Sequence, residues 1–412
     1  MSQTEVQLIK ADAVQTADIA NSAVTDAKIS ALTSSKLSGA LPAISGASLT
    51  NLPASGKAHN LVINGAMQVA QYGLSSDEDG YNTCDRFRYD KSGTDNNPTQ
   101  AQVDVASGTT PYTLGFRKAF KLTNGNQSSG AGANDLIAIK TRLEAQDIAN
   151  SGWNYTSTSS YITLSFWVKS SVAQNFYGYI RSYDGTSYLY PFETGSLSAN
   201  TWTKVTKTIA GNSNLQFDND ANLGLEIDIV QFYGTTYTDP GVSLNTWQTV
   251  SNYTPNNTST WYTTNDATFE LTGVQLEVGD SATDFEHLSF ADALTRCERY
   301  YQLIAPSVAE ALISDTHDYD NTTYFTVDLH TIMRSAPSLI VGNHTDAFRL
   351  YGTNPRNVNT FSVNTGVTTT SRILLYATGG SSGAVGFARI FKNTSGNQSG
   401  GTYAIIAVSS EL

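Results

Sequence analysis

Apolar and polar residues alternate along residues 161–169, and this period of two constrains the fold more than any other feature of the sequence. The apolar positions are Ile162, Leu164, Phe166 and Val168, and the positions between them are Thr163, Ser165, Trp167 and Lys169. Successive side chains of a β-strand point to opposite faces, so the pattern predicts a strand with one buried face. Similar runs cover residues 201–209, 223–232 and 268–278, separated by clusters of Gly, Asn, Ser and Thr. The sequence therefore predicts an antiparallel β-sandwich.

Two segments have helical character. Residues 135–149 are the best helix candidate inside the sandwich region, although 135–143 would also serve as a strand. Apolar residues spaced for one face of a helix predict a short connecting helix over residues 290–304. They are Phe290, Ala293, Leu294, Cys297 and Tyr301. Strand-like runs follow at 324–329, 338–341, 372–377, 385–391 and 403–408. The sequence therefore predicts a domain over residues 60–289 and a C-terminal β-sandwich domain with a leading helix over residues 290–412.

Residues 1–59 contain no aromatic side chain, and aliphatic residues recur in them every five positions. The repeat consists of Val14, Ile19, Val24 and Ile29. A period of five keeps to no single face of a helix or of a strand, so one chain alone cannot bury this stripe. Several copies wound about a common axis could bury it, with one aliphatic residue of each copy per layer. We therefore predict an intertwined stalk and attachment segment, with a disordered Ala/Ser-rich tail as the alternative.

The charge balance argues against two classes of partner. The formal net charge is −12, and only 15% of the residues are charged. Such an acidic chain lacks the cationic surface that binding to nucleic-acid phosphates requires. The longest wholly apolar run, residues 404–408, is far shorter than the roughly 20 residues of a membrane-spanning helix. We therefore expect no nucleic-acid partner and no membrane insertion. Cys84 and Cys297 are expected to be free buried thiols of a chain folded in a reducing cytosol.

The sequence carries no catalytic motif, and its five histidines are scattered, so we expect no enzymatic activity and no cofactor. One oxygen-rich group could hold a structural Ca²⁺ ion, a hard cation that seeks six to eight oxygen ligands. It consists of Asp218, Asp220, Glu226 and Asp228, and a similar cluster consists of Asp315, Asp318 and Asp320. A solvated acidic loop is the alternative for each.

Tyrosines gather around the turn signal Asp184-Gly185, which predicts a two-residue hairpin. The first strand carries Tyr177, Tyr179, Arg181 and Tyr183 on one face, and the second carries Tyr188 and Tyr190. If the two faces coincide, five tyrosines and an arginine line one side of the hairpin. Such a surface suits sugars, because the apolar C–H faces of a sugar lie on aromatic rings while its hydroxyls meet polar groups. Half-buried packing or contact between subunits is the alternative.

Aromatic residues in loop-like segments are secondary candidates for binding, under the same alternative. They are Trp153, Tyr155, Trp247, Tyr253, Trp261 and Tyr262.

Five sets of short strings, in a consistent order, resemble parts of one protein family. Residues 60–71, 84–87 and 163–171 resemble the opening of carbohydrate-binding-module-like domains in bacteriophage tail fibre proteins, and residues 269–279 with 282–286 are similar to the end of that domain. Residues 296–301 and 333–337 are similar to the C-terminal domain that often follows it. Residues 24–29 and 35–42 resemble phage fibre shafts.

The resemblance implies a homotrimeric, non-enzymatic virion fibre, assembled in the host cytoplasm, with a jelly-roll sandwich. It implies that the N-terminal segment contacts other tail or virion proteins and that the distal part attaches the phage to a bacterial surface glycan or another receptor. It supplies no catalytic residues. Two alternatives stay open: a structural virion component, such as a head fibre or tail adaptor, that never touches the host, and a polysaccharide-degrading tailspike that uses a carboxylate pair.

Overall fold

The computed structural model describes residues 60–305, 311–313, 316–319, 322–341, 348–351, 356–357, 360–378, 389–392 and 406–412. Every described residue belongs to one compact unit, which lies within residues 56–412. The predicted stalk over residues 1–59, with its repeat of Val14, Ile19, Val24 and Ile29, lies outside the described residues.

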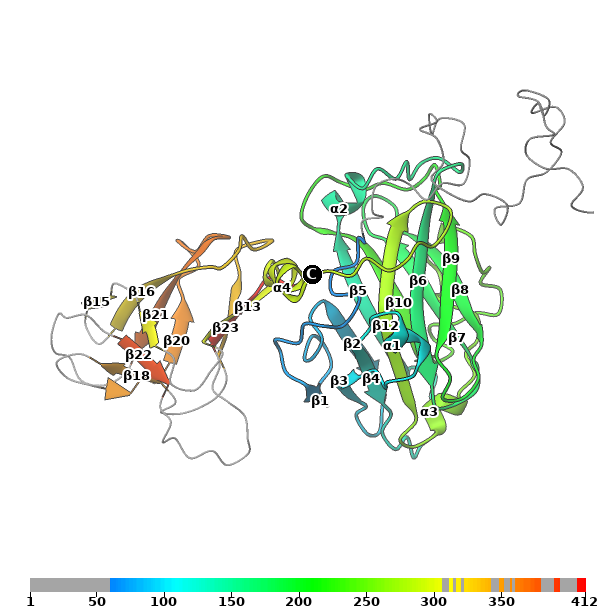
Figure 1. The fold of residues 1–412 in the computed structure, drawn as a ribbon, viewed down its shortest axis with the longest axis horizontal. Coiled ribbons are helices and arrows are strands. Elements are labelled where there is room, and N and C mark those ends of the chain that lie inside the picture. Colours follow the sequence, from blue (N-terminus) through cyan, green and yellow to red (C-terminus); the bar gives the residue numbers. More distant parts are fainter. Residues whose placement is uncertain are drawn as a thin grey trace, which may run out of the picture. The chain divides into compact units, whose positions relative to one another are not determined.

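Two six-stranded antiparallel sheets pack face to face between residues 75 and 278 (Figure 1). Sheet 1 has the strand order β1-β3-β4-β12-β6-β9, and sheet 2 has the order β11-β8-β7-β10-β5-β2. The strands of sheet 1 are β1 (Ser75–Ser76), β3 (Thr99–Asp104), β4 (Lys118–Thr123), β6 (Tyr161–Ser170), β9 (Thr203–Ala210) and β12 (Thr268–Val278). Those of sheet 2 are β2 (Phe87–Ser92), β5 (Leu136–Glu144), β7 (Asn175–Ser182), β8 (Tyr188–Ser196), β10 (Leu223–Tyr233) and β11 (Gln248–Thr249). The predicted β-sandwich is confirmed.

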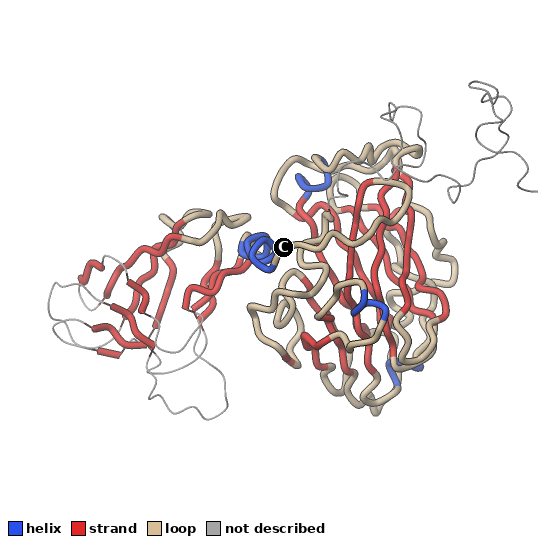
Figure 2. Tube along the Cα trace, viewed as in Figure 1, coloured by secondary structure: helices blue, strands red, loops and turns tan. Residues whose placement is uncertain are grey.

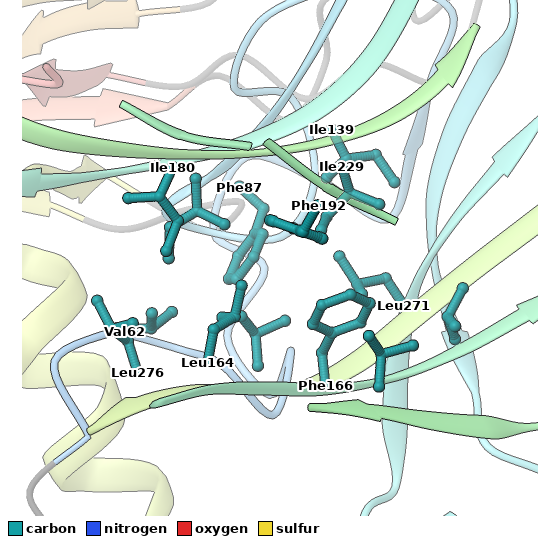
Figure 3. Close-up of a cluster of buried hydrophobic side chains, with 14 of the residues drawn as sticks. Val62, Phe87, Ile139, Leu164, Phe166, Ile180, Phe192, Ile229, Leu271 and Leu276 are labelled. Atoms are coloured by element: carbon teal, nitrogen blue, oxygen red, sulfur yellow. The ribbon is translucent and has the colours of Figure 1, made fainter. Parts of the chain in front are cut away.

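Apolar side chains from both sheets form one core between them (Figure 3). The inward positions of β6 are at most 1% exposed, as the alternation predicts, and they are Ile162, Leu164, Phe166 and Val168. Sheet 2 contributes Ile180 of β7 and Phe192 of β8 to the same core. Burying each of these side chains contributes roughly 1.5–3 kcal/mol. The opposite, outward faces of the sheets are therefore the places where functional side chains can lie.

Helices are short and few in the described part of the chain, as Figure 2 shows. They are α1 (Thr110–Thr113), α2 (Ala145–Ala149), α3 (Thr260–Thr263) and α4 (Phe290–Glu298). None of the described helices is long and apolar enough to cross a membrane. For residues 135–149 the strand alternative is confirmed, because Leu136–Glu144 pairs with β10 and β2 as strand β5. Only the last turn of the helix candidate is helical.

The connecting helix is shorter than the prediction of residues 290–304. Ser289 Oγ caps α4 by accepting a hydrogen bond from Asp292 N, and the helix ends at Glu298. The chain then leaves the helix because the backbone from Tyr301 pairs with a strand near residue 408. Phe290, counted in the predicted apolar face, is 57% exposed.

The region after α4 is β-rich, as predicted, and its described strands form three small antiparallel sheets. Their orders are β13-β23-β17, β14-β22-β18-β19 and β15-β16-β21-β20. The strands are β13 (Tyr301–Ala305), β14 (Ala311–Ile313), β15 (Thr316–Tyr319), β16 (Thr322–Asp328), β17 (Ser338–Val341), β18 (Phe348–Tyr351), β19 (Arg356–Asn357), β20 (Thr360–Val363), β21 (Arg372–Thr378), β22 (Arg389–Lys392) and β23 (Ile406–Ser409). The domain boundary at residues 289/290 stays a prediction.

Cys84 and Cys297 are both free and buried, which confirms the prediction for these thiols. Burial raises the pKa of each thiol well above its ordinary value, so both stay protonated at neutral pH.

Candidate functional site

The tyrosines around Asp184-Gly185 do not form one continuous surface, which corrects the prediction. Five residues, 183–187, separate β7 from β8, and Ile180 stands opposite Tyr190 in the register. A two-residue turn would instead have paired Tyr179 with Tyr190. Because side chains alternate with a period of two, this shift of one residue turns Tyr190 to the other face. Tyr190 and Tyr188 therefore pack on the core between the sheets.

The outward tyrosines of β7, and Tyr183 directly after it, make contacts within the protein. Tyr179 is 1% exposed, and its hydroxyl lies 3.3 Å from that of Tyr233. Tyr183 Oη donates a hydrogen bond of 2.8 Å to Glu226 Oε1. The guanidinium of Arg181 lies 4.6 Å from the centre of the Tyr183 ring. Tyr177 is half-buried. The packing alternative therefore describes this face better than a free sugar platform does.

The calcium prediction for Asp218, Asp220, Glu226 and Asp228 is wrong. No group of three His, Cys, Asp or Glu side chains in the described ranges is placed to hold a metal ion. Asp218 and Asp220 lie in an exposed loop, where their side chains accept hydrogen bonds from Gln216 and Asn222. Glu226 and Asp228 lie on β10 and are buried. In the second acidic cluster, Asp315 and Asp320 lie outside the described residues, and only the backbone of Asp318, in β15, is described.

Glu226 and Asp228 face two cations of β5. Lys140 Nζ lies 3.4 Å from Asp228 Oδ1, and Arg142 Nε lies 2.6 Å from Glu226 Oε2. Burial alone would raise the pKa of Glu226, but the charges of Lys140 and Arg142 outweigh it and hold the pKa at about 2. Burial raises the pKa of Asp228 well above its ordinary value. Both carboxyl groups are too buried to meet a substrate. The ion pair of Glu226 with Arg142 stabilises sheet 2.

Acid is expected to remove the stabilisation that Glu226 provides. Its folded pKa of about 2 lies below the ordinary value of 4.5, so the contribution is complete above about pH 4.5 and is lost as the pH falls through 2. The difference corresponds to about 3 kcal/mol. In urea unfolding, Glu226→Gln should be less stable than the wild type by about this amount at pH 6 and equally stable near pH 2. A difference between the two proteins that does not change with pH would contradict this assignment.

The secondary aromatic candidates are mostly structural. Trp153, Trp261 and Tyr262 are at most 3% exposed and belong to the core between the sheets. Tyr155 and Trp247 pack against the same core, and Tyr253 packs on the outer face of sheet 2 beside Tyr179.

A pocket of about 450 Å³ lies on the outer face of sheet 1, and sequence reasoning did not find it. Its aromatic lining is Phe116, Trp167, Phe285 and His287. Its polar side chains are Thr113, Ser165, Lys204, Thr283 and Asp284, of which Thr113, Lys204 and Asp284 are exposed. The pocket thus combines apolar ring surface with hydrogen-bonding groups.

A bulge in β12 brings two of the aromatic side chains together. The register of β12 against β6 shifts between Thr272 and Gln275, and Gly273 sits in the bulge with φ +62°. A Cβ atom at Gly273 would lie 2.7 Å from Phe116 Cζ and 3.2 Å from Trp167 Cδ1. Only glycine leaves room for both rings here. The packing of Phe116 and Trp167 in the pocket therefore depends on a glycine at position 273.

Phe116, Phe285 and His287 pack against one another at the pocket wall. The Phe116 and Phe285 rings meet edge to face at 4.9 Å between centroids, and Phe285 lies 5.0 Å from His287. His287 Nε2 lies 2.8 Å from Leu114 O and donates to it, which ties residues 283–287 to the loop before β4.

Two buried side chains of β12 hold residues 283–287 in place by hydrogen bonds. Glu277 Oε2 accepts a hydrogen bond of 2.6 Å from Thr283 Oγ1, and Gln275 Oε1 accepts one of 2.8 Å from Glu286 N. Glu277 and Gln275 are at most 1% exposed. The wall is therefore fixed before any ligand arrives, which lowers the entropy cost of binding.

Replacing Gly273 by Ala is expected to lower stability by about 2 kcal/mol and to displace Phe116, because the new Cβ combines a left-handed backbone with a clash. Gly130→Ala is the matched control, since Gly130 has φ +82° and nothing lies within 4 Å of the Cβ position. Urea unfolding of both variants measures the difference. Equal losses of stability would show that the close approach of Phe116 does not constrain this position.

A larger cavity of about 730 Å³ lies between α2 and α4. Its described lining contains Leu61, Ile63 and Val278 together with amide and arginine side chains, and no aromatic ring. Aromatic rings are the groups on which sugar rings stack, so the pocket beside Trp167 is the better candidate for a ligand of that kind.

No family model matches the sequence, and no curated protein matches it. Similar solved structures include the enzymatically active domain of tailspike protein 4 of bacteriophage CBA120, with 11% identity, a TM-score of 0.28 and a match over 53% of this chain and 21% of that one. They also include the tandem CBM22 domains of Paenibacillus barcinonensis Xyn10C, with 9% identity, a TM-score of 0.27 and a match over 88% and 100% of the two chains. A third is the family 11 carbohydrate-binding module of Clostridium thermocellum, with 10% identity, a TM-score of 0.24 and a match over 49% and 91%.

This chain therefore spans about a fifth of the length of the CBA120 chain that it matches. At TM-scores below 0.5, these likenesses establish neither a shared fold nor a shared function.

Proposed function

We propose that this chain is a virion fibre protein that attaches a bacteriophage to a glycan of the host surface, without cleaving it. The observation that carries the proposal is the pocket in which Trp167, Phe116 and Phe285 stand beside exposed polar groups. A sugar ring can place its C–H face on the half-buried indole of Trp167 while its hydroxyls bond to the rim. The volume of about 450 Å³ is within the ordinary range for ligand pockets.

The resemblance of the sequence strings to phage tail fibre proteins supports the rest of the proposal. In such a fibre three copies would be joined through the segment of residues 1–59, which would also contact other tail or virion proteins. Three equivalent pockets raise the effective concentration of sites, so weak binding at each could still give firm attachment.

Competition with infection tests the function. The purified full-length chain, added in excess to host cells before the phage, is expected to bind the cells and to slow phage adsorption. A chain that neither binds cells nor slows adsorption would contradict attachment and would favour a structural component of the particle.

Two further measurements separate the remaining alternatives. Incubation with extracted host polysaccharide is expected to release no new reducing ends, and their release would identify a degrading tailspike instead. Light scattering after size-exclusion chromatography is expected to give three times the mass of 44.3 kDa, and a stable monomer would contradict the trimer.

A further inference from the structure

The outward positions of sheet 1 beside the pocket carry more positive than negative charge. In the register, Glu270 of β12 stands opposite Lys121 of β4 on one side and Lys169 of β6 on the other. Trp167 of β6 stands opposite Lys204 of β9. With Glu277 of β12, which stands opposite Thr163 and accepts a hydrogen bond from Thr283, this face holds three lysines against two glutamates, on a chain whose net charge is −12.

The lysines of this face differ in their contacts. Lys169 Nζ lies 2.8 Å from Glu270 Oε2 and 5.1 Å from the centre of the Trp202 ring, so its ammonium is already paired within the protein. Lys204 is exposed and makes no ion pair within the part of the chain that the structure describes. Its ammonium is therefore the available cation of the pocket.

Lys204 and Trp167 form a directly opposed cross-strand pair. Side chains in such pairs have Cβ atoms about 4.5–5.5 Å apart. A sugar ring on the Trp167 indole thus brings its substituents within reach of the ammonium. The acidic group of the pocket, Asp284, belongs to the other wall, residues 283–287. A ligand with one anionic substituent would turn that group towards β9 and its hydroxyls towards Asp284.

We propose that the pocket binds an anionic glycan, with a sugar carboxylate or phosphate paired to Lys204 and its ring on Trp167. This inference rests on the proposed glycan-binding function. A charge-assisted hydrogen bond from Lys204 is stronger than one between neutral groups. It also selects acidic sugars over neutral ones on a protein that otherwise repels anions.

The test uses polysaccharide extracted from the host, in native form, after carboxyl reduction and after dephosphorylation with hydrogen fluoride. Binding of the full-length wild type and of Lys204→Gln is measured by calorimetry at 50 and 500 mM NaCl. Lys207→Gln is the matched control, because Lys207 lies on the same strand but has the parity of the inward residues Val205 and Ile209.

We expect Lys204→Gln to weaken binding of the native polysaccharide about fivefold to tenfold at 50 mM NaCl and to lose most of its salt dependence. Lys207→Gln should bind like the wild type. One of the two chemical treatments should weaken wild-type binding by a similar factor. Weaker binding after carboxyl reduction would identify a sugar carboxylate as the group bound, and weaker binding after dephosphorylation would identify a phosphate.

Equal binding of native and treated polysaccharide, with Lys204→Gln unaffected, would overturn the inference. The glycan-binding function would still stand in that case, provided that Trp167→Ala removes binding. If the wild type binds none of the three preparations, the proposed function itself fails.

Discussion

Trp167→Ala is expected to weaken binding to host polysaccharide by about thirtyfold or more while leaving the sandwich folded. The indole lines the pocket and is half-buried on the outer face of sheet 1, so its removal takes away the surface on which a sugar ring would lie. An aromatic residue at the centre of a binding site typically contributes about 2 kcal/mol or more, which corresponds to that factor. Calorimetry with the extracted polysaccharide measures the loss, and circular dichroism checks the fold.

Tyr161→Ala is the matched control for Trp167. Tyr161 lies on the same strand and has the same parity, so it shares the outer face, and it is 36% exposed. Six residues of strand separate the two positions by about 20 Å. Tyr161→Ala should bind like the wild type. If it weakens binding as much as Trp167→Ala does, or if Trp167→Ala binds normally, the pocket is not the glycan site.

Glu411→Gln is expected to lower the free energy of unfolding by about 3 kcal/mol, because it leaves a buried guanidinium without its carboxylate. The side chain of Arg86 is 2% exposed and forms an ion pair with Glu411. Arg86 also donates a hydrogen bond of 2.6 Å to Arg142 O and lies 3.4 Å from the centre of the Tyr300 ring. Tyr72 Oη donates a hydrogen bond of 3.0 Å to Glu411 Oε1. Urea unfolding at pH 7 measures the loss.

The exposed pair of Arg372 and Asp328 provides the control for this buried one. Their side chains are 61% and 73% exposed, so water screens the pair and Asp328→Asn should leave the free energy of unfolding nearly unchanged. Similar small effects at both positions would show that Glu411 does not fix residues 410–412 on the sandwich.

The strands were predictable because a strand with one buried face alternates apolar and polar residues along the sequence. The runs predicted at 201–209, 223–232 and 268–278 correspond within two residues to β9, β10 and β12. Residues 135–149 are the segment of the sandwich for which the sequence allowed both a helix and a strand, and this ambiguity has a physical cause. An almost fully buried strand such as β5 lacks a clear alternation, so its apolar run resembles a helix.

The candidate site could not be predicted, because it depends on details that strand patterns do not record. The length of the β7–β8 loop decides which face Tyr190 takes, and one residue reverses it. The pocket depends on the bulge at Gly273 and on residues 283–287, which are more than 100 positions from Trp167. The sequence did contain one signal for the site. Trp167 occupies an outward position of a strand, and a large indole ring at such a position indicates a contact outside the core between the sheets.

Fluorine NMR of the 5-fluorotryptophan protein tests the central claim most directly, because the chain has five tryptophans and each gives its own signal. Single Trp→Phe variants assign the signals of Trp153, Trp167, Trp202, Trp247 and Trp261. On titration with oligosaccharides from the host surface, the Trp167 signal is expected to shift most, while those of the buried Trp153 and Trp261 stay in place. A titration that moves Trp247, beside Tyr190, and leaves Trp167 unchanged would contradict a glycan site on sheet 1.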